Sequence, residues 1–259
     1  MFQISRKTKF LSYSVPLFWG FASPALADWT RISSDTIQLV GDIQRSSYEE
    51  YKAVAASGYS RVRLKSFGGV PLVALKIAED IAARKVEVIV DGYCFSSCAN
   101  YLVLAGAQLT VPCGALIGWH GTPTLESDDE IRRSFAAKNY PASLTDTYLG
   151  WLNDFRKREQ EFFKGIKVDH RILEDSVAIP IAEKLKAKVD YKFDSETGAI
   201  STITSQAPLW IPESKTLKKY GVQIEGFCTQ YSRADIENYL QQRGFKFQVS
   251  SGDSVGDRN

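Results

Sequence analysis

The sequence predicts an α/β fold with a mostly parallel sheet, because strand-like and helix-like runs alternate over residues 34–121. Thr36 to Val40, Arg61 to Lys65 and Val86 to Val90 are rich in β-branched and aliphatic residues, which is typical of strands. Between the last two, Val70 to Ala83 repeats apolar residues at helical spacing. Such alternation is typical of parallel strands that are joined by right-handed crossover helices.

Two further runs complete this core. Ala99 to Ala105 is apolar and predicts a helix, and Ala115 to Trp119 predicts another strand. The carboxyl ends of parallel strands meet along one edge of a sheet, and binding sites lie beyond that edge. We therefore expect the segments that follow the strands to converge there, namely Gly68-Gly69, Ser96-Ser97 and His120.

Residues 122–249 predict a helical and hairpin extension of the same domain, which we place at 28–249 with its core at 34–121. The expected elements are helices over 127–165 that break at Pro141, a helix over 180–188, a hairpin over 191–204 and a helix over 232–243. The aromatic helical face in 148–164 favours packing on the core or on a second subunit, so a homo-oligomer is one expectation. Residues 250–259 are polar and predict a disordered tail.

The first 27 residues have the pattern of a cleavable secretory signal peptide. A basic stretch from Arg6 to Lys9 precedes a short apolar run from Phe10 to Ala22, and Ala25-Leu26-Ala27 has the small-x-small pattern of a cleavage site. The apolar run is too short to span a bilayer, so a buried or anchoring helix is the less favoured alternative. We expect a periplasmic or secreted protein whose mature chain starts near Asp28.

Cleavage would also change the charge of the protein. The leader holds three basic and no acidic residues, so its removal changes the formal charge from +2 to −1. Nucleic-acid-binding proteins carry a basic patch or stripe. We therefore expect no nucleic-acid partner.

All four cysteines lie in the expected mature chain, and an even number in an exported protein predicts disulfides. Four cysteines allow three pairings, which the sequence does not distinguish; our hypothesis is Cys94 with Cys98 and Cys113 with Cys228. A metal site is the alternative. The C-x3-C spacing is poor for zinc and the chain has only two histidines, so we expect no metal and no cofactor.

The segments expected at the sheet edge carry residues for nucleophilic catalysis. Ser96 and Ser97 lie where a strand turns into a helix, where backbone N–H groups can stabilise an oxyanion. His120 could be the general base that a serine nucleophile needs, and Gly68 and Gly69 could bring bare backbone close. Each feature alone has a structural explanation, such as a turn or a helix cap, but their joint placement favours catalysis.

Four short motifs follow one another in the core: Ser66-Phe67-Gly68-Gly69-Val70, the serine turn, Leu104-Ala105-Gly106 and Leu116-Ile117-Gly118-Trp119-His120. This order resembles the proteolytic subunit of the Clp protease and its exported, periplasmic relatives in the Clp/crotonase superfamily. The family pattern is Ser-Pro-Gly-Gly-Val, an Ala-Ser-Met elbow, Ala-Gly and Met-Ile-His. Phe67, Cys98 and Gly118-Trp119 depart from it. The resemblance covers roughly residues 34–121 and implies a core of ββα repeats.

The resemblance also implies roles for these residues. It makes His120 the catalytic histidine and Gly68 and Gly69 the oxyanion turn, with a second N–H from the residue after the nucleophile. The nucleophile has two candidates. Motif spacing selects Ser97, which would make Cys98 the second oxyanion donor, whereas the symmetric Cys-x-Ser-x-Cys pattern selects Ser96. We prefer Ser97.

The catalytic aspartate of the family has no clear counterpart here. It precedes a Tyr-Gly strand, which Tyr220-Gly221-Val222 resembles, but Ala207-Pro208-Leu209-Trp210 before it contains no aspartate. Residues 180–207 have the character of an insertion. Asp175 lies in the right general region and is our candidate. A missing orienting group costs orders of magnitude in rate.

The resemblance and the residues together predict a periplasmic serine hydrolase, of peptidase type, that acts on a peptide or protein. The alternative is a non-catalytic binding protein on the same fold, with a Cys94–Cys98 disulfide that clamps the serine turn. An acyl-CoA enzyme of crotonase type is disfavoured because export separates it from coenzyme A. No ATPase partner is expected either, since no ATP is expected outside the cytoplasm.

Overall fold

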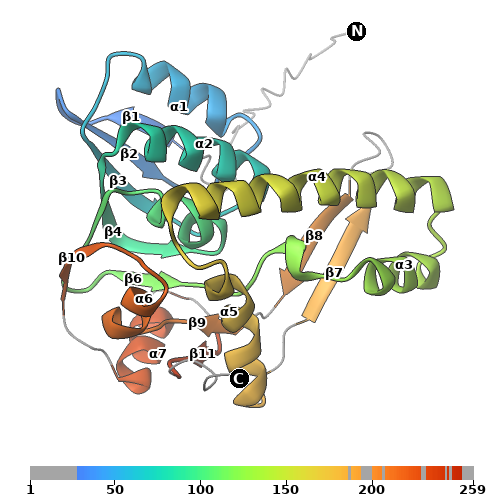
Figure 1. Ribbon diagram of the computed structural model, residues 1–259. Coiled ribbons are helices and arrows are strands. Elements are labelled where there is room, and N and C mark those ends of the chain that lie inside the picture. Colours follow the sequence, from blue (N-terminus) through green and yellow to red (C-terminus); the bar gives the residue numbers. More distant parts are fainter. Residues whose placement is uncertain are drawn as a thin grey trace, which may run out of the picture.

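The computed structural model describes residues 28–185, 188–193, 200–205, 208–228, 232–242, 244 and 247–252. The expected signal peptide lies outside these residues, as do residues 253–259 of the expected tail. Helices and strands alternate along the described chain (Figure 1), and the predicted α/β fold with a mostly parallel sheet is confirmed.

The main sheet has seven strands in the described chain, in the order β1-β2-β3-β4-β5-β10, with β6 beside β4. The strands are β1 (Asp28–Arg31), β2 (Thr36–Val40), β3 (Arg61–Ser66), β4 (Glu87–Phe95), β5 (Gln108–Val111), β6 (Leu116–Gly118) and β10 (Ile224–Phe227). Only the β1–β2 pair is antiparallel among these strands. The strand expected at 220–222 is instead a turn that precedes β10.

Strand β4 is longer than its sequence suggests, because it has a different partner at each end. Its first half pairs with β5, and Tyr93 to Phe95 pair in parallel with Leu116 to Gly118 of β6. The sequence predicts a strand that ends at Val90, two residues before Gly92. In the structure Gly92 has a positive φ of 98°, the register between β3 and β4 shifts beside it, and the strand continues.

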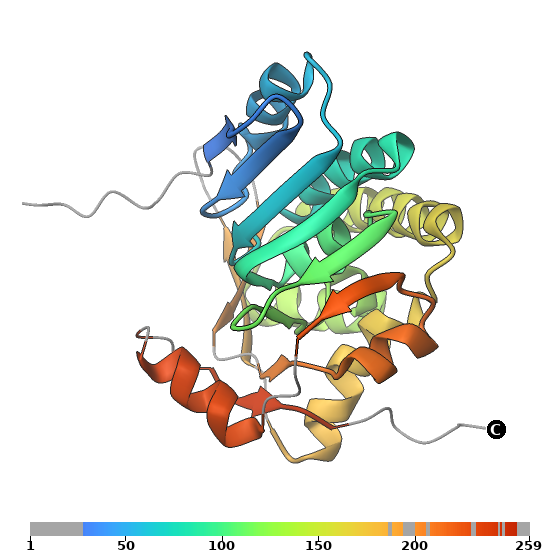
Figure 2. The ribbon, with the colours of Figure 1, turned by 90° about the vertical axis from the view of Figure 1, so that its left-hand side faces the viewer.

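Three helices cover one face of the sheet, namely α1 (Ser47–Ala55), α2 (Pro71–Arg84) and α4 (Ala142–Ile166). Figure 2 shows the strands in front and these helices behind them. The main core lies between, and its buried side chains include Leu39, Leu64, Ile77, Val90 and Phe155. The opposite face is covered near β6 by α7 (Arg233–Gln242), with a smaller apolar cluster around Phe95 and Leu116.

The second half contains α3 (Asp128–Ala137), α4, α5 (Arg171–Ala182), β9 (Leu209–Trp210) and α6 (Ser214–Lys219). The break at Pro141 and the last helix are confirmed, as is the hairpin, whose strands are β7 (Lys188–Phe193) and β8 (Ile200–Ser205). The helix expected over 180–188 is wrong. The buried stripe of α5 starts at Ile172, and Pro180 lies in its last turn.

Ser250, expected to begin the disordered tail, is ordered in the structure. Val249–Ser250 forms β11, which pairs in parallel with β9, and Ser250 is fully buried. Its hydroxyl also donates to Glu183, 2.9 Å away. Tertiary pairing therefore orders a segment whose polar composition alone favours disorder.

Two disulfides join the cysteines in the expected pairing, Cys94 with Cys98 and Cys113 with Cys228. Disulfides form and persist in oxidising compartments, which agrees with an extracytoplasmic location. Within the part of the chain that the structure describes, no helix is both long and apolar enough to cross a membrane.

Candidate functional site

The two serines lie on a sharp turn between β4 and the π-helix η1 (Cys98–Val103), which replaces the α-helix expected at 99–105. Ser96 has a φ of 57°, in the left-handed region that non-glycine residues rarely occupy. Its N–H donates to Gly118 O at 3.0 Å, and its carbonyl accepts from the Asn100 N–H at 2.8 Å. Neighbouring segments therefore hold Ser96 in this conformation from both sides.

The two serines differ in environment. Ser96 is partly exposed, whereas Ser97 is only 1% exposed. The Ser97 hydroxyl donates a hydrogen bond to the carbonyl of Gly69, 3.1 Å away. Ser97 thus ties the serine turn to the glycine turn, and Ser96 is the serine that solvent can reach.

The glycine turn packs directly on the serine turn. A Cβ atom added at Gly68 would lie 2.8 Å from the Cβ atom of Ser96 and 2.8 Å from the nitrogen of Ser97. The turn is held from its other side by Ile43, whose N–H donates to Gly68 O at 2.6 Å and whose carbonyl accepts from the Val70 N–H at 2.8 Å. The structure therefore brings together the glycine turn and the serines, as expected.

Only part of the predicted oxyanion turn has a free donor. The Gly68 N–H donates to the Ser66 hydroxyl at 3.0 Å. The Gly69 N–H makes no hydrogen bond to any described residue. The N–H groups of Ser97 and Cys98 lie in the first turn of η1, where backbone donors lack partners within the helix.

His120 lies at the same edge of the sheet. Phe95 of β4 is paired with Gly118 of β6. Ser97 lies two residues after Phe95 and His120 two residues after Gly118, so both residues lie beyond the same end of the two strands. Burial lowers the pKa of His120, which favours the neutral imidazole that can accept a proton. Within the described ranges, no hydrogen bond joins its ring to Ser96 or Ser97.

Asp175, the candidate acid, makes a different contact. It lies on α5, and its carboxylate accepts a hydrogen bond from the Tyr220 hydroxyl at 2.5 Å. Burial and this bond raise the pKa of Tyr220. Among the described residues, no hydrogen bond joins Asp175 to His120.

The disulfide Cys94–Cys98 brackets the serine turn. Cys94 is the second-last residue of β4 and Cys98 is the first residue of η1. The bond between them therefore closes a loop that contains both serines. Both cysteines are fully buried. The bond therefore limits how far the turn can relax from its left-handed conformation.

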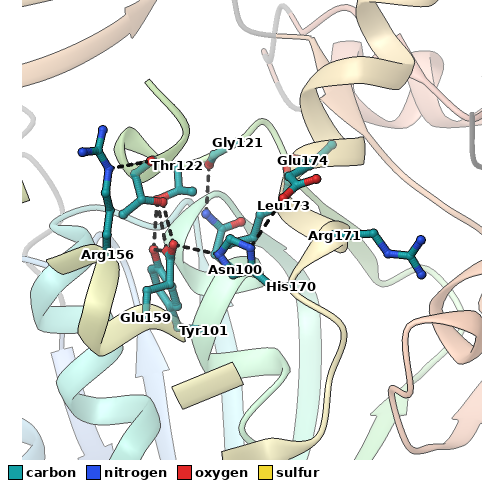
Figure 3. Close-up of polar contacts among 12 residues, drawn as sticks. Asn100, Tyr101, Gly121, Thr122, Arg156, Glu159, His170, Arg171, Leu173 and Glu174 are labelled. Carbon is teal, nitrogen blue, oxygen red and sulfur yellow. Dashed lines mark hydrogen bonds and ion pairs between the residues drawn. The ribbon is translucent and has the colours of Figure 1, made fainter. Parts of the chain in front are cut away.

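A buried polar cluster beneath this edge was not predicted. Glu159 of α4 is 1% exposed, and Figure 3 shows hydroxyl groups and His170 converging on its carboxylate. Its donors are the hydroxyls of Tyr101 at 2.5 Å, Thr124 at 2.5 Å and Thr122 at 3.3 Å, and His170 Nε2 lies 3.1 Å away. The cluster holds the segment after His120 against η1 and α4.

A signal for this cluster exists in the sequence. Glu159 lies four residues after Phe155 and three before Phe162, on the apolar stripe of an amphipathic helix. A carboxylate on such a stripe has to find hydrogen-bond donors in the core. The donors come from other elements, so the sequence identifies the position but not its partners.

The contact between Glu159 and His170 should make stability depend on pH. The hydrogen bond to Glu159 raises the pKa of His170 despite partial burial, and Glu174 and Asp169 add to this effect. A raised folded-state pKa stabilises the fold fully below the unfolded-state pKa of about 6.5, and the contribution disappears as the pH rises through the folded-state value. We expect the loss of unfolding free energy in His170→Gln to be larger at about pH 6 than at about pH 9. Urea unfolding at both pH values measures this, and equal losses would contradict it.

No model of a protein family matches the chain, and no curated protein matches it. Among the described residues, no group of three or more histidine, cysteine or acidic side chains is arranged to hold a metal ion. The interpretation of the site therefore depends on its own geometry.

Proposed function

We propose that the protein is a periplasmic serine hydrolase of peptidase type, on a fold similar to that of the Clp/crotonase superfamily. The conformation of Ser96 carries the proposal. The α/β-hydrolases place their nucleophile on a strained strand-to-helix turn, where the hydroxyl is exposed and the next N–H stabilises the oxyanion. A left-handed serine between a strand and a helix, packed on a glycine turn, fits this arrangement.

Accessibility favours Ser96 as the nucleophile over Ser97. The Ser97 hydroxyl is buried and donates to Gly69 O, so an attack by Ser97 would first have to break that bond. With Ser96 as nucleophile, the N–H groups of Ser97 and Gly69 are the natural oxyanion donors. This assignment reverses the preference that motif spacing suggests.

The proposed reaction follows the usual course of acyl transfer. His120 takes the proton of the Ser96 hydroxyl while the oxygen attacks the carbonyl carbon of the substrate. The protonated imidazole then gives this proton to the leaving amine as the C–N bond breaks, which leaves an acyl-enzyme. His120 then takes a proton from a water molecule while the water oxygen attacks the acyl carbon, and it returns this proton to the Ser96 oxygen as the ester bond breaks.

A non-catalytic binding protein is the second candidate. It is favoured by the absence, among the described residues, of a hydrogen bond between His120 and either serine. Catalytic hydrogen bonds are often long in structures without substrate and tighten only in the complex. The hydrolase therefore remains our first proposal.

Labelling with a fluorophosphonate probe tests the proposal. We expect the wild-type protein and Ser97→Ala to be labelled and Ser96→Ala not to be labelled, with His120→Ala slower by about 10²–10⁴-fold. Ser34→Ala, which removes an exposed serine far along the chain from the site, is the control and should label normally. Labelling of Ser96→Ala but not Ser97→Ala would refute the choice of nucleophile, and no labelling of the wild type would favour the binding protein.

A further inference from the structure

Asp42 lies beside the glycine turn, and its carboxylate pairs with no cation among the described residues. It is partly buried, and burial raises its pKa. No hydrogen bond or ion pair to its carboxylate occurs in the described part of the chain, whereas Asp91 of β4 pairs with Arg63 of β3 at 3.0 Å. A half-buried carboxylate that lacks a cation is unfavourable. A cationic group beside Asp42 would therefore stabilise the folded protein.

The start of the expected mature chain lies next to it. Asp28 begins β1 and pairs in antiparallel register with Val40 of β2. Strand β2 ends at Val40, and Asp42 follows after Gly41, which has a φ of 102°, on the side from which the chain enters β1. Two residues of chain span at most about 7 Å. Cleavage after Ala27 would leave the α-amino group of Asp28 within reach of the Asp42 side chain.

Asp42 is also coupled to the proposed site through the backbone. The next residue, Ile43, makes both hydrogen bonds that hold the glycine turn, one to Gly68 O and one from the Val70 N–H. The same turn packs on the serine turn and carries the free Gly69 N–H. An interaction that holds Asp42 in place would therefore also hold Ile43, whose backbone supports the turn with the proposed oxyanion donor.

We infer that removal of the leader creates an ion pair between the new α-ammonium group of Asp28 and the carboxylate of Asp42, and that this pair stabilises the glycine turn. The inference rests on the proposed function for its effect on the site, but the ion pair itself does not. Before cleavage the nitrogen of Asp28 is an uncharged amide, so only the processed chain can form the pair. Export and activation of the site are thereby linked.

Two chains test this inference, one that starts at Asp28 after removal of a fused tag and one that keeps two extra residues, Gly-Ser, before Asp28. We expect the chain that starts at Asp28 to melt about 2–4 °C higher, and to react several-fold faster with the fluorophosphonate probe. In Asp42→Asn both differences should vanish. In Asp91→Asn, the matched control, both should persist.

The outcomes separate the ion pair from the hydrolase. Equal melting temperatures of the two chains, or a difference that persists in Asp42→Asn, would overturn the ion pair, because a steric effect of the extension does not need the carboxylate. A melting difference that depends on Asp42 together with equal labelling rates would overturn the effect on the glycine turn. A melting difference that depends on Asp42 without labelling of any chain would support the ion pair and reject the hydrolase.

Discussion

Replacement of Glu159 by alanine is expected to lower the free energy of unfolding by about 3–5 kcal/mol. The carboxylate accepts hydrogen bonds from Tyr101, Thr124 and Thr122 and lies beside His170, and it is almost completely buried. Alanine would remove the carboxylate that accepts from the buried hydroxyl of Tyr101, and it would remove the nearer of the two carboxylates that face His170. Urea unfolding at neutral pH measures the loss.

Glu161→Ala is the matched control, because Glu161 is exposed on the same helix. It should change the unfolding free energy by less than about 0.5 kcal/mol. Glu159→Gln keeps the shape of the side chain but replaces one carboxylate oxygen, which accepts hydrogen bonds, with an amide NH₂, which donates them. Its loss of unfolding free energy should therefore lie between those of Glu159→Ala and Glu161→Ala. A loss below about 1 kcal/mol in Glu159→Ala would show that the cluster is not the stabilising centre that its geometry indicates.

Gly69→Ala is expected to destabilise the protein by about 3–5 kcal/mol and to abolish probe labelling, because two effects act at one position. Gly69 has a φ of 142°, which side chains rarely allow, and an added Cβ would lie 2.1 Å from the carbonyl oxygen of Ile43. The obstacle is backbone and not the end of a flexible side chain. The turn would have to move away from Ile43 and from Ser97.

Gly58→Ala separates the two effects. Gly58 also has a positive φ, of 75°, but no atom lies within 4 Å of an added Cβ. Gly58→Ala should lose only the about 1 kcal/mol of unfolding free energy that a side chain costs at a positive φ, and it should keep full labelling. Equal unfolding midpoints for the two variants would contradict the close approach of Gly69 to Ile43.

The architecture could be predicted because it depends on local pattern. β2 has the predicted bounds, α2 lies within one residue of its prediction at each end, and the glycine turn, the serine turn and His120 all follow strands of the sheet, as the alternation of elements required. The disulfide pairing also agrees, although the sequence left three choices open.

The rest depends on contacts between distant segments. β4 continues past Gly92 because β6 pairs with its second half, which no local pattern reveals. Asp175 is close to Tyr220 and Glu159 to Tyr101, partners separated by 45 and 58 residues in the sequence. The choice between Ser96 and Ser97 likewise needed the backbone angle and the burial of each hydroxyl.

The complete burial of Cys94 and Cys98 has a consequence for the order of events in biosynthesis. Thiol–disulfide exchange requires an attacking thiolate to reach a sulfur atom, and neither sulfur is reachable once β4 and η1 are packed. An oxidant therefore has to act on the emerging chain before this edge closes, and a reductant that meets the finished protein arrives too late. The redox state of the compartment in which the chain folds therefore decides whether this bond forms, and the environment that the folded protein enters afterwards does not.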